Sequence, residues 1–218
     1  ADTKAVSDAA SLEAIGREIR AARVLSEGRG LLAINVMRAV AEYAASVKKA
    51  LEAGIDAVVV GAGLPLDLPD LASDHPDALL VPILSDARGV QLIVKKWERK
   101  KRLPDAIVIE HPRLAGGHLG AAKIADLNDP RFDFENVIPQ SRAFLKSAGI
   151  EREIPLIAAG GIRSFEDIAQ LQSLGAAGVP EALGRWEVLA VAGFLYAMEF
   201  VADKIPYVDS INDVLQTF

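Results

Sequence analysis

The chain has 218 residues, 51% of them apolar and 25% charged, and its formal charge is −6. This composition indicates a globular protein with a sizeable core, and the negative charge argues against nucleic acid as a partner. The count of zero cysteines excludes disulfides, thiolate metal sites and cysteine nucleophiles. Residues 1–6 lack the basic and apolar regions of a secretory signal, so we expect a cytoplasmic protein.

Short apolar runs alternate with amphipathic stretches along the chain, a pattern typical of βαβ units with a parallel sheet. The runs predict strands at residues 30–37, 57–63, 78–85, 105–111 and 154–161, with a truncated sixth at 176–179. Between the strands, apolar residues recur at steps of three and four, which predicts helices that pack on the sheet through one stripe. The stripes are Leu12, Ile15 and Ile19; Val40, Tyr43, Val47 and Leu51; Val90, Ile93, Val94 and Trp97; and Ile168 and Leu171. Ser164 is the expected N-cap of the last helix.

The composition changes after Val179. Residues 180–218 predict a hydrophobic helix, a break at Pro206 and a short amphipathic end. The apolar stretch 188–202, interrupted by Glu199, is shorter than the ~18–20 residues that cross a bilayer as a helix. A buried or partner-facing helix is therefore the expectation, with membrane association through 186–202 left open.

Three glycine-bearing segments follow predicted strands: Gly61-Ala62-Gly63, Gly116-Gly117-His118 and Gly160-Gly161. The carboxyl ends of parallel strands meet at one rim, where α/β proteins place their sites, so these segments are expected to lie together. Gly160-Gly161 stands between a strand and a helix, where exposed backbone amides can approach a phosphate. The alternative for this pair is a close packing corner between strand and helix.

His118 is the best candidate among the three histidines, because it lies in a glycine-bearing loop after a strand and imidazole exchanges protons near neutral pH. A surface histidine is the alternative. His75 lies in a polar loop and His111 at a strand end without neighbouring glycines, so both are weaker candidates. The three are too scattered for a zinc site.

Two further polar features each allow two interpretations. Asn35 interrupts the apolar run 30–37, and a buried amide must find hydrogen-bond partners, either in a ligand or in neighbouring backbone. Asp67 and Asp70 lie beside two prolines, and we expect a structured surface crossing there rather than a metal loop.

Four motifs, GLLAINVM, VVVGAGLPLDLP, PDAIVIEHPRLAGGHLG and IPLIAAGGIRSFEDIAQLQSLGAAGV, together resemble the nitronate monooxygenase family, formerly called 2-nitropropane dioxygenases. The resemblance covers residues 1–179. It implies an α/β fold of (β/α)8 TIM-barrel type that holds non-covalent FMN and oxidises alkyl nitronates with dioxygen to a carbonyl compound and nitrite.

Carried to this sequence, the resemblance makes His118 the catalytic base for a neutral nitroalkane. Gly160 and Gly161 match the phosphate-binding pair, Asn35 and Gly61 match strand ends that line the flavin, and Gly116 and Gly117 belong to the cofactor-binding loop. No metal is implied.

The family's opening strands and last strand are not matched, and residues 180–218 resemble a fragment of an uncharacterised bacterial integral-membrane family. We therefore expect a partial FMN-binding (β/α) barrel at 1–179 and a helical tail of different origin at 180–218. A five- or six-stranded barrel leaves open edges, which the tail, a partner or a homo-oligomer could cover.

Three alternatives to a nitronate monooxygenase stay open at this point. One is a flavin-dependent enoyl-thioester reductase, which would need a nicotinamide donor. Another is an inactive truncated or fused barrel that serves as an interaction or membrane-associated module. The third is a sugar-phosphate or nucleotide enzyme that uses the glycine pair without flavin.

Overall fold

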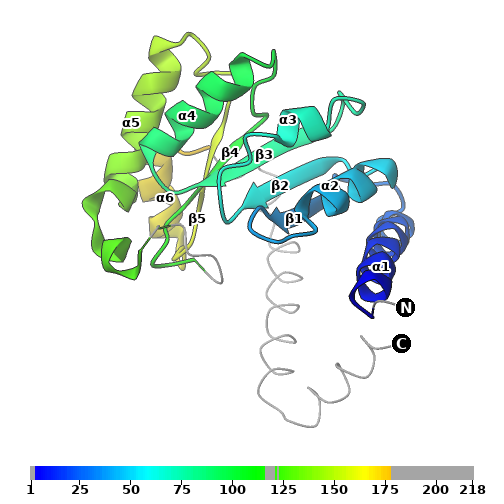
Figure 1. The fold of residues 1–218 in the computed structure, drawn as a ribbon. Helices are drawn as coiled ribbons and strands as arrows, with labels where there is room; N and C mark the ends of the chain where they lie inside the picture. Colours follow the sequence, from blue (N-terminus) through cyan, green and yellow to red (C-terminus); the bar gives the residue numbers. More distant parts are fainter. Residues whose placement is uncertain (1–2, 116–120, 122, 178–218) are drawn as a thin grey trace. The chain divides into compact units, whose positions relative to one another are not determined.

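Five parallel strands form one sheet in the order β1-β2-β3-β4-β5 (Figure 1). The structure, a computed structural model, describes residues 3–115, 121 and 123–177. The strands are β1 Ala33–Met37, β2 Ala57–Gly61, β3 Leu79–Leu84, β4 Ile107–Glu110 and β5 Leu156–Ala159. The five complete strands expected from the sequence are all confirmed, each shorter than its apolar run because the flanking residues turn away from the sheet.

Helices precede, connect and follow the strands. They are α1 Thr3–Leu25, α2 Tyr43–Glu52, α3 Leu68–Leu71, α4 Ala87–Glu98, α5 Phe134–Ser147 and α6 Phe165–Leu174, with two 3₁₀ turns, η1 Ile124–Asn128 and η2 Pro130–Phe132. The four predicted stripes lie largely on α1, α2, α4 and α6; Val40 precedes α2. The sequence did not reveal α5, whose stripe is interrupted by Pro139 within the helix. The buried residues Val137, Ile138 and Leu145 nevertheless lie on it.

The two faces of the sheet differ in burial. The face covered by helices carries residues that are almost wholly buried: Val58, Val60, Ile107 and Ile109 are 0% exposed and Leu80 is 1% exposed. On the opposite face, Met37 and Ile157 are 43% and 42% exposed. The strand register places Met37 beside Gly61, and Glu110 beside Ala159, on this second face. We call it the open face.

Sequential parallel strands with intervening helices are the arrangement of a TIM-barrel-like fold. Within the described residues β1 and β5 do not pair, so this part of the barrel is open. The Ala177 amide donates to the Leu156 carbonyl over 2.7 Å, so the chain returns to the edge of β5 where a sixth strand was predicted. Residues 178 and 179, and the predicted tail 180–218, lie outside the described residues. No helix in the described part is long and apolar enough to span a bilayer.

Candidate functional site

The carboxyl ends of β2 and β5 carry the described glycine turns at one rim of the sheet. At β5, Gly160 and Gly161 have φ angles of 94° and 72°, a backbone region that residues with a Cβ rarely adopt. At β2, a Cβ on Gly61 would lie 3.1 Å from the Ile83 side chain of the neighbouring strand. Two of the three predicted glycine segments are thus brought to one rim.

Leu114, in the loop after β4, lies directly over the Gly160–Gly161 turn. A Cβ on Gly160 would lie 3.2 Å from the Leu114 carbonyl oxygen, and one on Gly161 would lie 2.5 Å from Leu114 Cδ1. The pair is therefore closely packed, but against a loop and not at the expected corner between strand and helix. The packing partner is the loop after β4, and Gly161 is exposed beside it.

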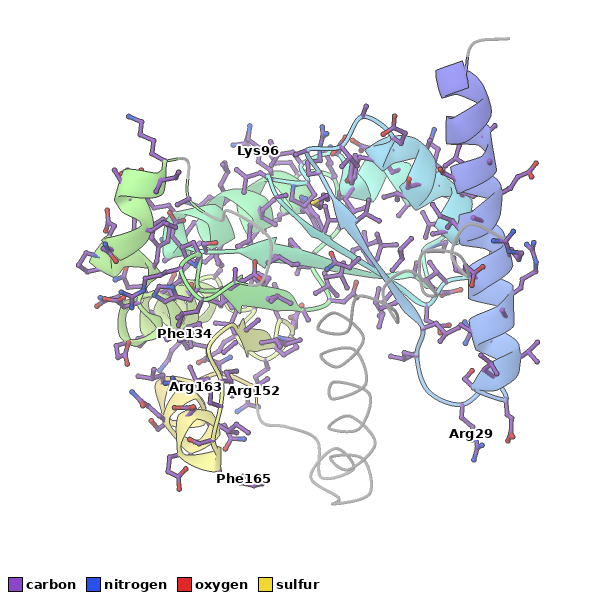
Figure 2. All side chains as sticks on the ribbon, turned by 90° about the horizontal axis from the view of Figure 1, so that it is seen from below. Arg29, Lys96, Phe134, Arg152, Arg163 and Phe165 are labelled. Carbon is purple, nitrogen blue, oxygen red and sulfur yellow. The ribbon has the colours of Figure 1, made fainter. Side chains whose placement is uncertain are left out.

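The N-terminus of α6 follows this turn and is capped by its own side chains. Ser164 Oγ accepts from the Asp167 amide over 3.2 Å, which confirms Ser164 as the N-cap. The Asp167 carboxylate accepts from the Arg163 and Ser164 amides over 2.8 and 3.0 Å. These bonds, the one from Arg163 first, lower the pKa of Asp167. Figure 2 labels Arg163 and Phe165 at this end of the helix.

The backbone amides of the turn that have no acceptor determine what it can bind. In the described part of the chain, the amides of Gly161 and Ile162 donate to no acceptor, whereas those of Arg163 and Ser164 are held by Asp167. Two adjacent free amides near a helix N-terminus can bind an anion such as a phosphate. Gly161 and Ile162 therefore supply the candidate anion-binding amides of the turn.

The exposure of Asn35 differs from what its sequence context predicts. The sequence predicted a buried amide, but the side chain is exposed in the middle of β1, beside Val59 on the open face. Alternation in a strand sends it away from the helices to the open face, where Met37 of the same strand is also exposed. Its amide is therefore available to a ligand on the barrel interior.

Gly116, Gly117 and His118 lie outside the described residues. The chain just before them is fixed by hydrogen bonds: the Leu114 amide donates to the His111 carbonyl over 2.9 Å, and Arg113 Nη1 donates to Asn128 Oδ1 over 3.2 Å. The loop that carries the three residues thus leaves the rim at the end of β4, two strands away from Gly61.

His111 and Glu110 lie next to each other at the carboxyl end of β4, on opposite faces of the sheet. His111 is 4% exposed at the end of β4, and its ring contacts Asp133 and Phe134. Glu110 is half-buried, with its position on the open face beside Ala159. The sequence already indicates this position, because Glu110 is the one charged residue in the run DAIVIEH that alternation places on the barrel interior.

The two carboxylates of the loop after β2 pair with basic side chains. Asp67 Oδ1 lies 3.3 Å from Arg38 Nε, and Asp70 pairs with Lys100. The Arg38 guanidinium lies 4.6 Å from the centre of the Tyr43 ring, and burial, with Asp67 adding to it, raises the pKa of Tyr43. Within the described chain no group of three or more acidic or histidine side chains is arranged to hold a metal ion.

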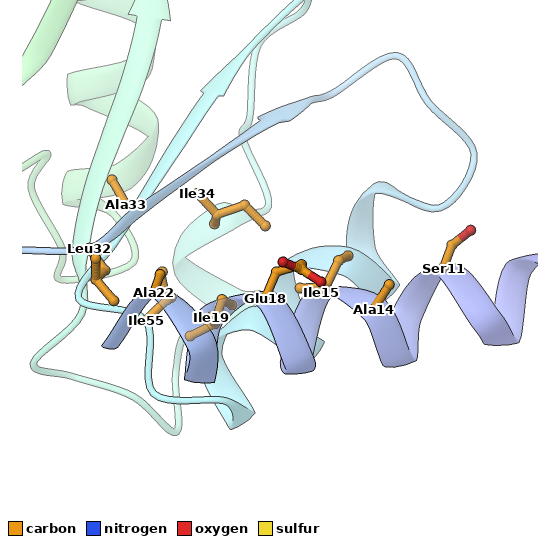
Figure 3. Close-up of a pocket in the computed structure, with 10 residues that line it drawn as sticks. All are labelled: Ser11, Ala14, Ile15, Glu18, Ile19, Ala22, Leu32, Ala33, Ile34 and Ile55. Carbon is orange, nitrogen blue, oxygen red and sulfur yellow. The ribbon is translucent and has the colours of Figure 1, made fainter. Parts of the chain in front are cut away.

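An apolar cavity of about 500 Å³ lies elsewhere, between α1 and the amino-terminal half of β1 (Figure 3). Ile15 and Ile19 line it from the helix, and Leu32 and Ile34 from the strand side. It is at the opposite end of the sheet from the glycine turns. We therefore place the candidate site at the rim, on its backbone geometry, and not in this apolar cavity.

Sequential parallel strands with intervening helices define a chain of TIM-barrel type, and the glycine turn ahead of the capped helix α6 is its candidate binding site. The chain belongs to the nitronate monooxygenase family, whose pattern matches residues 19–184.

Two solved structures share the fold. A point mutant of FabK from Thermotoga maritima superposes with a TM-score of 0.55 at 19% identity, over 75% of this chain and 48% of that one. A nitroalkane oxidase from Streptomyces ansochromogenes superposes with a TM-score of 0.53 at 15% identity, over 77% of this chain and 53% of that one.

A curated relative is an imidazole-4-carboxamide isomerase of Methanothrix thermoacetophila, whose name specifies a substrate with two phosphoribosyl groups. It is 32% identical over 137 residues, which are 61% of this chain and 53% of the relative. The chain thus spans about half the length of this relative and of the two structures.

Proposed function

We propose that this chain is an FMN-dependent oxidoreductase of nitronate monooxygenase type, which oxidises alkyl nitronates with dioxygen to a carbonyl compound and nitrite. The observation that carries the proposal is the Gly160–Gly161 turn at the end of β5. Membership of the family, the free amides of Gly161 and Ile162, and the open face beside the turn all support it.

The residues present fit a flavin phosphate. A Cβ would be strained at both glycines, so the backbone stays bare at the turn. The amides of Gly161 and Ile162, together with the positive end of the α6 dipole, would hold the phosphate. Gly61 keeps the end of β2 free of a side chain, and Asn35 offers an amide donor and acceptor on the open face for the ring.

Bound FMN supplies the redox chemistry, and the protein contributes binding, orientation and shielding. The chain's own task is proton handling and charge placement. A nitro group makes the adjacent carbon acidic, and His118 would remove that proton at its imidazole when the substrate is a neutral nitroalkane. Glu110, on the open face at the same rim, would set the charge near the ring.

A second candidate is a phosphate-ester enzyme that uses the same turn without flavin. The isomerase of Methanothrix thermoacetophila favours it, because its named substrate carries two phosphoribosyl groups and the match reaches 32% identity. This alternative predicts binding of a sugar phosphate such as ribose 5-phosphate and no retention of FMN.

The test is the visible absorbance spectrum of the purified chain before and after addition of FMN, with dialysis, run in parallel with riboflavin. Retained, shifted flavin bands with FMN but not with riboflavin would support a phosphate-anchored flavin site. Propyl nitronate with dioxygen, and separately NADH, then distinguishes the monooxygenase from an enoyl-thioester reductase. A chain that binds neither flavin, but binds ribose 5-phosphate, would contradict the proposal in favour of the second candidate.

We further propose small-molecule partners, namely a nitronate or nitroalkane and dioxygen, and a cytoplasmic setting. A homo-oligomer would cover the open edges of the sheet. Sedimentation of the purified chain with and without detergent tests this: a discrete oligomer without detergent supports it, and dispersal only in detergent supports membrane association through 186–202.

A further inference from the structure

The buried His111 is the side chain that the proposed chemistry leaves without a task. It follows β4 directly, and its amide continues the ladder by donating to the Ala159 carbonyl over 3.2 Å. Its side chain is only 5% exposed. Because alternation points it to the same side as Ile107 and Ile109, it lies on the helix-covered side of the sheet and not on the open face.

Both ring nitrogens of His111 face a partner. Nδ1 accepts from the Arg113 amide over 3.2 Å, and Nε2 lies 3.4 Å from Asp133 Oδ1. A ring nitrogen that accepts carries no proton, so the proton lies on Nε2, toward the carboxylate. Asp133 therefore selects the tautomer that leaves Nδ1 able to hold the Arg113 amide.

Asp133 is placed for this role by α5. It occupies the N-cap position, yet its carboxylate makes no capping hydrogen bond and faces His111 instead. The next residue, Phe134, meets the imidazole edge-on, with ring centres 5.7 Å apart. The start of α5 thus fixes the imidazole in position and in tautomer.

Leu114 connects the position of Arg113 to the glycine turn. Two hydrogen bonds shape the turn that follows β4. The Arg113 amide donates to His111 Nδ1 over 3.2 Å, and the Leu114 amide donates to the His111 carbonyl over 2.9 Å. That turn sets Leu114 against Gly160 and Gly161. A displacement of Arg113 would therefore move the leucine that packs on the turn with the two free amides.

We propose that His111 is a positioning residue: its imidazole, held by Asp133, fixes the Arg113–Leu114 turn against Gly160–Gly161 and so sets the affinity of that turn for a phosphate. The effect on FMN rests on the proposed function. The effect on the turn itself does not.

Two substitutions distinguish the contact made by Nδ1 of His111 from the contact made by Nε2. His111→Asn keeps an acceptor near the Nδ1 position for the Arg113 amide and loses the Asp133 contact. His111→Gln reaches toward Asp133 with its amide group but leaves the Arg113 amide without an acceptor. Both lose the ring and its packing against Phe134, so a purely structural role would weaken both variants alike.

The first measurement is amide hydrogen exchange at Arg113, read together with the free energy of unfolding. We expect exchange at Arg113 to stay near the wild-type rate in His111→Asn and to rise at least about tenfold in His111→Gln, at similar global stability. Equal exchange in the two variants would overturn the proposal, whether or not the chain binds flavin.

The second measurement is FMN affinity by quenching of flavin fluorescence. His111→Asn should retain it within about threefold, while His111→Gln should lose about tenfold or more. Leu114→Ala, a change at a residue 43% exposed and so safe for folding, should also weaken FMN at least about threefold. If the wild type binds no FMN the proposed function fails, and hydrogen exchange still decides the role of His111. Unchanged affinity in both His111→Gln and Leu114→Ala would refute the link to the phosphate.

Discussion

Leu114 fills the space in which a side chain on Gly161 would lie, since a Cβ there would come within 2.5 Å of Leu114 Cδ1. Gly161 also has a φ of 72°. The loop after β4 and the turn after β5 therefore meet at a position where the backbone conformation favours glycine and an added side chain would have to displace Leu114.

Gly161→Ala should lower the free energy of unfolding by about 2–4 kcal/mol, combining strain at positive φ with the clash against Leu114. Gly149→Ala is the matched control, because Gly149 has a φ of 76° and nothing within 4 Å of its would-be Cβ. That control should cost only about 1 kcal/mol. Urea unfolding measures both, and equal losses would show that Leu114 yields without cost.

His118→Ala should separate two substrates. With a neutral nitroalkane the rate should fall roughly 10²–10⁴-fold, because the general base is lost. With the pre-formed nitronate anion no proton has to be removed, and the rate should stay within about threefold of the wild type. Steady-state oxygen consumption with nitroethane and with ethyl nitronate is the measurement, and a parallel loss on both substrates would assign His118 to binding.

Trp97→Phe should destabilise the chain by about 1–3 kcal/mol, because the wholly buried indole Nε1 donates to the Pro65 carbonyl over 3.1 Å and phenylalanine leaves that acceptor unpaired. Lys100→Ala probes the exposed anchor of the same loop, where Nζ donates to the Leu66 carbonyl over 2.8 Å. Its cost should be about 0–1 kcal/mol. Chemical denaturation followed by circular dichroism compares the two; a larger loss in Lys100→Ala would reverse their order.

Asp56 should make stability depend on pH at the acid end. Its pKa is lowered below 3.8, first by the hydrogen bond from the Leu32 amide and then by Arg23 Nη2, which lies 2.8 Å from Oδ2. A carboxyl with a depressed folded-state pKa binds protons more readily when unfolded, so its stabilising effect is complete above the unfolded value and is lost as pH falls through the folded one.

Asp56→Asn should therefore cost about 1–2 kcal/mol at pH 7, and the gap to wild type should close as pH falls below about 4. Glu52→Gln is a control at a carboxylate 65% exposed, with an expected change below about 0.5 kcal/mol at every pH. Urea midpoints between pH 3 and pH 7 give the comparison, and a gap that widens toward acid would contradict the sign.

Sequence patterns predicted well wherever the cause is local. The apolar runs predicted all five described strands, and Ser164 with its acidic neighbours predicted the start of α6, because strand burial and helix capping depend on residues close in the chain. The helix α5 escaped notice, since Pro139 breaks the stripe although tertiary packing keeps the helix intact.

The sequence alone determined the strands, the helices α1, α2, α4 and α6, and the place of the glycines at strand ends, because each follows from periodicity and residue chemistry over a few positions. The family followed from the resemblance of four motifs taken together. Tertiary structure decided three other matters: the exposure of Asn35, the contact of Leu114 with Gly161, and the pairing of His111 with Asp133. Each joins or separates residues far apart in the chain. Their outcome depends on which strand neighbours which and on which side of the sheet the helices cover, and no local pattern fixes either.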